Sequence, residues 1–90
     1  MASFFQSISP DFASPGDRFT VIIRGDSLTG TTAVSLGADV AILTFAVADD
    51  GEIRARIEVS FDAALGKRDL TITDLSGTNT FPSVFEIVQF

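Results

Sequence analysis

Three carboxylates lie close together in one short segment, Asp49-Asp50-Gly51-Glu52. Carboxylate oxygens are the ligands that calcium prefers, so Asp49, Asp50 and Glu52 form a candidate calcium site. The segment lacks the spacing of an EF-hand loop, and its Asp-Gly pair favours the positive φ values of a tight hairpin turn. We therefore favour a solvated hairpin tip, and an unchanged melting temperature in millimolar calcium would exclude the metal.

A second candidate site is the tripeptide Arg24-Gly25-Asp26, which spells the integrin-recognition sequence. It lies where an alternating apolar segment is expected to give way to a loop, which would expose it. Tripeptide matches often arise by chance, and a glycine at the end of a strand has a structural use of its own. We therefore expect Arg24 and Asp26 to be ordinary surface residues. An Asp26→Glu variant in a cell-attachment assay separates the two interpretations.

The residue types that the sequence lacks exclude several kinds of chemistry. The chain has 90 residues and contains no Cys, His, Trp or Tyr. Without Cys and His there is no zinc, haem or iron–sulfur ligand set, and no Cys–His or Ser–His nucleophile. Carboxylate pairs remain as acid–base candidates, but nothing in the sequence sets the pKa of one apart from another. We expect a protein that is not an enzyme and binds no cofactor.

The charge balance restricts the partners. There are 6 basic and 12 acidic side chains, a net charge of -6, so the sequence offers no basic stripe for nucleic acid. No apolar run approaches the roughly 18 residues that a membrane-spanning helix needs. Met1-Ala2-Ser3-Phe4-Phe5 lacks the basic and apolar regions of a secretory signal. The expected partner is a protein, either a second copy or a larger scaffold.

Apolar and polar residues alternate along most of the chain. In residues 53–59, four apolar residues share one face, whereas Arg54, Arg56 and Glu58 point to water. This period of two is typical of strands with one buried face, and Pro-Gly, Asp-Gly and Ser-Gly pairs mark the turns between such segments. The pattern predicts seven strands, at residues 4–9, 18–25, 32–36, 40–48, 53–60, 68–74 and 83–89.

Seven short strands in a single domain, residues 1–90, predict an all-β fold, an antiparallel immunoglobulin-like (Ig-like) β-sandwich. Residues 61–65 could form one helical turn closed by Gly66. We interpret this segment as a crossover between strands.

The sequence from about Ile8 to Val88 resembles immunoglobulin-like domains of the IPT/TIG family, and two parts of it carry the resemblance. One contains Ile8-Ser9-Pro10, Ser14-Pro15-Gly16-Asp17, residues 19–25 and Leu28-Thr29-Gly30-Thr31-Thr32. The other is residues 63–73, a small-residue turn and glycine followed by a strand of alternating threonines and apolar residues. The resemblance implies that Leu28 lies in the core. It also implies a non-catalytic module, since similar domains occur in microbial surface proteins, as accessory domains of enzymes and in phage particles.

The nine phenylalanines suggest a contact surface. Phe19, Phe45 and Phe85 fall at core positions, whereas four others gather near the chain ends and the last loop. The last predicted strand is apolar on both faces, and only Pro82 at its entrance blunts it as an edge. We expect a surface that docks on another subunit or domain, made of Phe4, Phe5, Phe81, Val84, Val88 and Phe90. The alternative is a modestly apolar monomer.

These features predict a structural or protein-binding module of a larger assembly. Two settings are open. In the first, it is one domain of a secreted or cell-surface microbial protein, acting as a spacer, an adhesion element or a carbohydrate-side accessory of an enzyme. In the second, it is a complete small virion protein, such as a phage capsid decoration or tail component. A neighbouring capsid gene would favour the second setting, and an in-frame continuation beyond Phe90 would favour the first.

Overall fold

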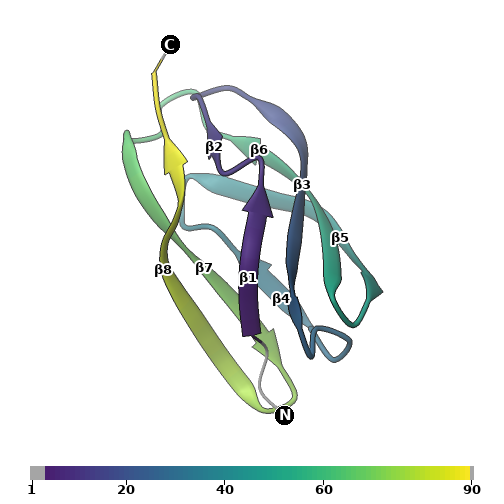
Figure 1. Cartoon of the computed structure of the whole chain (residues 1–90). Helices are drawn as coiled ribbons and strands as arrows, with labels where there is room; N and C mark the ends of the chain where they lie inside the picture. The colour runs from purple at the N-terminus through teal and green to yellow at the C-terminus, as the bar shows by residue number, and fades with distance from the viewer. Residues whose placement is uncertain (1–3, 90) are drawn as a thin grey trace.

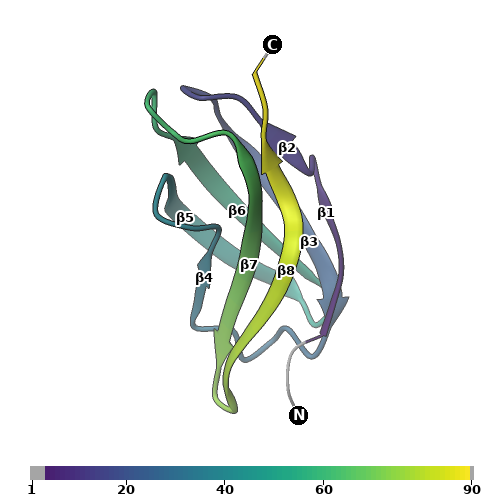
Figure 2. The same cartoon turned by 90° about the vertical axis from the view of Figure 1, so that its left-hand side faces the viewer.

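The computed structural model describes residues 4–89, which form two four-stranded sheets packed face to face (Figure 1). Sheet A has the order β1-β3-β6-β5, with β1 (Phe4–Ser9), β3 (Arg18–Asp26), β6 (Glu52–Val59) and β5 (Val40–Asp49). Sheet B has the order β2-β8-β7-β4, with β2 (Phe12–Ala13), β8 (Gly77–Ile87), β7 (Gly66–Asp74) and β4 (Ala33–Ser35). Figure 2 shows the two layers from the side. The prediction of an all-β sandwich is confirmed.

Residues 4–89 contain eight strands, where the sequence predicted seven. The added strand is β2, whose two residues are too few to show alternation. It pairs in parallel with β8, Phe12 opposite Glu86 and Ala13 opposite Ile87, so the sandwich is not wholly antiparallel. The expectation that the last strand forms an open edge is wrong, because β8 lies between β2 and β7.

The last strand also begins earlier than predicted. A tight turn at Leu75 and Ser76 joins β7 to β8, and pairing resumes at once with Asp74 opposite Gly77. Gly77 has a φ of 126°, which a glycine adopts without steric cost. The polar residues after Gly77 are therefore part of a strand, although their composition is typical of a loop.

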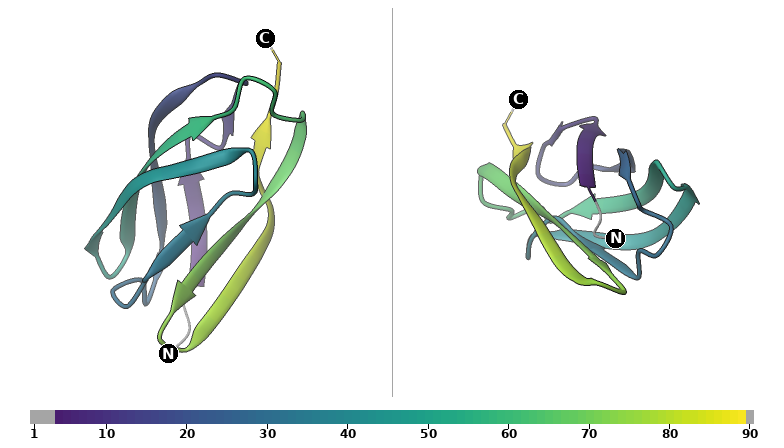
Figure 3. Two further views of the ribbon diagram at one scale, coloured as in Figure 1. Left: turned by 180° about the vertical axis from the view of Figure 1, so that it is seen from behind. Right: turned by 60° about the horizontal axis from the view of Figure 1, so that its bottom comes forward.

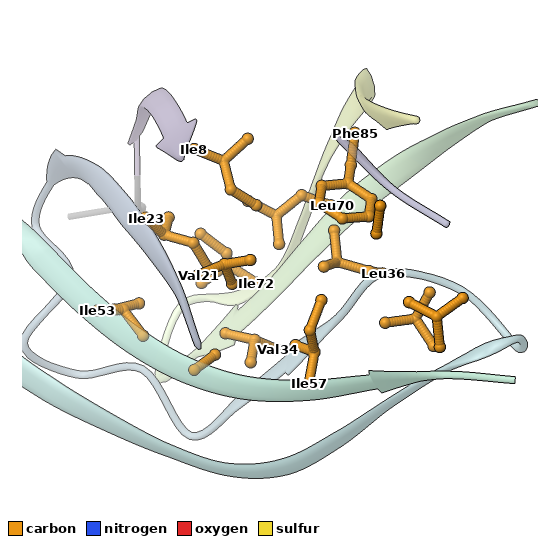
Figure 4. Close-up of a cluster of buried hydrophobic side chains, with 14 of the residues drawn as sticks. Ile8, Val21, Ile23, Val34, Leu36, Ile53, Ile57, Leu70, Ile72 and Phe85 are labelled. Atoms are coloured by element: carbon orange, nitrogen blue, oxygen red, sulfur yellow. The ribbon is translucent and has the colours of Figure 1, made fainter. Parts of the chain in front are cut away.

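The core lies between the two sheets (Figure 4). Ile53, Ala55 and Ile57 of β6 face Leu70 and Ile72 of β7, and all five are fully buried. Burial of each of the isoleucine and leucine side chains stabilises the fold by about 1.5–3 kcal/mol, so a strand that alternates strictly gains from every inward position. The inward set predicted from the sequence for β6 is confirmed.

Two loop leucines complete the core. Leu28 follows β3 and Leu36 follows β4, and neither side chain has any exposure. The core position that the family resemblance implied for Leu28 is confirmed. Thr31 closes the turn around Leu28, since its backbone N–H and its hydroxyl both donate to the Leu28 carbonyl, at 3.1 and 2.7 Å.

Residues 61–65 form no helix. A turn in which Ala63 N–H donates to the Ser60 carbonyl (3.2 Å) carries the chain from β6 in sheet A to β7 in sheet B, as the crossover interpretation predicted. No helix within the described range, residues 4–89, is long and apolar enough to cross a membrane.

Candidate interaction surfaces

The three clustered carboxylates lie at the β5–β6 hairpin, and each is engaged by the protein. Asp49 Oδ1 accepts the Gly51 N–H at 2.8 Å, and Asp50 Oδ1 accepts the Thr29 hydroxyl at 2.7 Å. Glu52 is almost buried and pairs with Arg24 at 3.2 Å and Arg54 at 2.6 Å. Among residues 4–89, no three acidic side chains form a group that could hold a metal ion.

Asp50 and Asp39 each fix one loop against another. The hydroxyl and backbone N–H of Thr29 lower the pKa of Asp50, so this carboxylate holds the loop after β3 against the hairpin. A hydrogen bond from Arg68 lowers the pKa of Asp39, 2.7 Å away. Arg68 also donates to the Ala64 carbonyl at 2.6 Å. Carboxyls held ionised in this way are suited to fastening loops rather than to donating protons.

Gly25, the centre of the candidate integrin tripeptide, is buried beneath β1. A Cβ atom there would lie 1.9 Å from the Phe4 carbonyl oxygen, so only glycine permits this approach of the two strands. Arg24 and Asp26 are exposed on either side, and Arg24 pairs with Glu52. The tripeptide lies within β3 rather than in a free loop. The packing requirement accounts for Gly25, while cell attachment stays a prediction.

The predicted aromatic surface is partly used inside the domain. The rings of Phe5 and Phe81 lie 5.5 Å apart, and both pack against the core together with Val84. Val88 is half-buried and its N–H donates to the Ala13 carbonyl at 2.8 Å. Phe4 is the one large exposed side chain of this set within the described residues, and Phe90 lies outside them. The pair Phe5–Phe81 therefore joins β1 of sheet A to β8 of sheet B.

The outward face of sheet A carries four of the six basic residues of the chain, Arg18, Arg24, Arg54 and Arg56. Arg18 pairs with Glu58, whereas Arg56 lies between Thr20 and Thr44, and its guanidinium makes no hydrogen bond or ion pair with another residue of 4–89. The exposure of Arg54 and Arg56 was predicted from alternation. Their grouping with Arg18 and Arg24 depends on strand pairing, which the sequence does not reveal.

Large apolar side chains are exposed at the two ends of the elongated domain, which the sequence analysis missed. Phe61, in the β6–β7 connection, and Leu75, in the β7–β8 hairpin, are each 91% exposed. The two connections lie at opposite ends of the sandwich (Figure 2). Surface depressions flank Phe61 on two sides, one lined by Gly16 and Arg18 and the other by Pro15 and Leu65. The sequence did contain an indication of these exposed side chains. Both connections have the composition of turns except for their large apolar residues.

No protein family matches the chain, and no curated protein is significantly similar to it.

Proposed function

We propose that this domain is a non-catalytic, protein-binding module of a larger assembly, with an Ig-like sandwich of the IPT/TIG type. The observation that carries the proposal is the exposure of Phe61 and Leu75 at opposite ends of the fold. Burying such side chains against a neighbour removes apolar surface from water, which is the main favourable term in protein association. Phe61 also lies between two depressions, so it combines an apolar projection with adjoining recesses.

The shape of the domain supports contacts at its ends. Its principal extents are 38 × 21 × 18 Å, so the long axis is about twice each of the others. The first described strand, β1, begins toward the end that carries the β7–β8 hairpin, and β8 ends toward the opposite one (Figure 2). A module of this form can follow another in series, with its Phe61 end against a neighbour.

The settings that suit such a module are a microbial cell surface and a virion. A surface protein would use it as a spacer or adhesion element, and a phage particle as a capsid decoration or tail component. A carbohydrate-side accessory role in an enzyme is the remaining alternative. All three place the domain in contact with a protein scaffold.

Imaging of the native assembly tests the proposal. We expect the protein, isolated from its source under native conditions, to occur in regular copies on a particle or a cell surface. Recovery of the domain only as a free species would overturn the proposal.

A matched pair of variants tests the Phe61 end itself. Phe61→Ser together with Leu65→Ser should reduce incorporation into the assembly and leave the melting temperature unchanged, since both side chains are exposed. Thr20→Ala, exposed on the outward face of sheet A and away from both depressions, is the control and should be incorporated normally. Equal incorporation of both proteins would exclude this end as the contact.

A further inference from the structure

We propose that β5 pairs with the β5 strand of a second copy, joining two A sheets into one continuous sheet across a two-fold axis. β5 is the terminal strand of sheet A, with β6 on one side (Figure 3). On its other side no strand of residues 4–89 pairs with it. An edge strand presents alternate backbone N–H and C=O groups that a further strand can pair.

The composition of β5 lacks the usual protection of an edge. Residues 40–48 read Val-Ala-Ile-Leu-Thr-Phe-Ala-Val-Ala and include no charged residue, proline or glycine. Charged side chains and prolines are two of the devices by which soluble proteins prevent edge-to-edge pairing, and β-bulges are a third. Leu43, in the middle of the strand, is 42% exposed.

The other three edges of the sandwich are short or covered. β2 has 2 residues and β4 has 3, whereas β5 has 10. β1 has 6 residues and lies against β8 of sheet B, where Phe5 packs on Phe81. β5 is approached from sheet B by the 3-residue β4. β5 is thus the edge of this domain that offers a long strand for pairing.

Two bulges interrupt β5 but leave its centre regular. Its register against β6 shifts between Ile42 and Thr44, and again between Val47 and Asp49. Residues 44–47 remain in regular antiparallel pairing between the two shifts. The regular run lies between the two shifts, so the centre of β5 offers four consecutive residues for pairing with a further strand.

The second copy is favoured over other partners because β5 is complementary to itself. With the axis at Phe45, Thr44 lies opposite the partner's Ala46 on the outward face, and the two half-buried Phe45 rings meet on the core side. Asp49 then lies opposite the partner's Ala41, so no two acids face each other. Moving the axis to Thr44 would bring Asp39 opposite the partner's Asp49, which like-charge repulsion opposes.

An axis between two residues is excluded by side-chain direction. Such a register would place an outward residue opposite an inward one, and the apolar set of one copy would then face water. Among the residue-centred axes that keep the acids apart, the axis at Phe45 pairs the greatest length of β5, residues 41–49, whereas an axis at Ala46 pairs residues 43–49.

Sedimentation equilibrium at concentrations up to a millimolar tests the pairing. We expect a reversible rise in mass from the 9.5 kDa of one chain to twice that value. Leu43→Lys should keep the protein monomeric, because pairing would bury a charge on the edge. Gln6→Lys adds the same charge at an exposed position on β1, at the opposite edge of sheet A, and should dimerise as the unmodified protein does. A single chain mass at every concentration, or a dimer that Leu43→Lys leaves intact, would overturn the proposal.

Cross-linking tests the register. The chain contains no cysteine, so single cysteines report on single positions. Residues directly opposite in an antiparallel pair have Cβ atoms about 5 Å apart, within reach of a disulfide after oxidation by copper–phenanthroline. A mixture of Thr44→Cys and Ala46→Cys proteins should cross-link several-fold more than either protein alone. Equal cross-linking in the three samples would exclude the axis at Phe45.

Discussion

Gly25 is the glycine at which an added methyl group would come closest to another atom. Gly25→Ala would force the Phe4 carbonyl oxygen away, which shifts β1 and the Phe5–Phe81 contact that follows it. We expect Gly25→Ala to destabilise the domain by about 3 kcal/mol, the upper range for overpacking, in urea unfolding.

Gly30→Ala is the matched control for this substitution. Its added methyl group meets no atom within 4 Å, so the free energy of unfolding should change by no more than about 0.5 kcal/mol. Equal stability of the two variants would show that β1 moves aside without cost, and that the packing requirement does not explain Gly25.

The Asp39–Arg68 pair predicts a specific dependence of stability on pH. Arg68 lowers the pKa of Asp39 in the folded state. The stabilisation is therefore present above the unfolded pKa, about 4, and is lost as the pH falls through the lower, folded pKa. Asp39→Asn removes this contribution, so between about pH 5 and about pH 2 it should lose less stability than the unmodified protein.

Asp62→Asn provides the comparison for the pH experiment. Its exposed carboxylate makes no hydrogen bond or ion pair with another residue of 4–89, and lies in the loop that Asp39 helps to fix. Urea unfolding across the same pH range should give this variant the acid sensitivity of the unmodified protein. If Asp39→Asn shows that sensitivity too, the ion pair does not stabilise the fold.

At the scale of elements, the loop after β3 is part of the core. Leu28 is fully buried, and its N–H donates to the Asp50 carbonyl at 2.9 Å, which ties the loop to the β5–β6 hairpin. Leu28→Ala should lower the free energy of unfolding by about 2–5 kcal/mol, the range for a buried leucine. Leu75→Ala, at an exposed turn, should change it by no more than about 0.5 kcal/mol. Similar losses in both variants, measured by urea unfolding, would contradict the burial of this loop.

The elements that the sequence predicted well are those with one buried face. Alternation located β6 within one residue at each end, because Ile53, Ala55 and Ile57 all face the core. It missed β2, whose two residues are held by pairing with β8 rather than by their own pattern. Alternation also predicted too short a strand for β8, because the polar start of that strand is fixed by its pairing with β7.

The candidate surfaces were less predictable than the strands, because they too depend on how strands pair. Exposure of Arg54 and Arg56 follows from one strand, whereas the grouping of four arginines needs the register of β3 against β6. The edge position of β5 likewise depends on the order of the strands in the sheet, and local sequence carries no information about that order.

The charge of the whole molecule is distributed unevenly. Four of six basic residues lie on one face of sheet A, and the ion pairs among residues 4–89 engage Asp39, Glu52, Glu58 and Glu86. Most of the 12 acidic side chains therefore have no basic partner in these pairs. Repulsion between them opposes the compact state, and salt screens repulsion between exposed charges.

We expect the melting temperature to rise as sodium chloride is increased from low ionic strength to about 0.15 M, where the screening length is about 8 Å. Asp62→Lys changes the net charge from -6 to -4 by replacing an exposed acid, so it should raise the melting temperature at low salt and weaken the dependence on salt. Salt also screens the repulsion between two acidic copies and so strengthens their association. Calorimetry is therefore done at protein concentrations below those at which β5 pairs, so that the change in melting temperature reports on the stability of the single domain. A melting temperature that falls with added salt would mean that the ion pairs on sheet A outweigh the repulsion among the remaining acids.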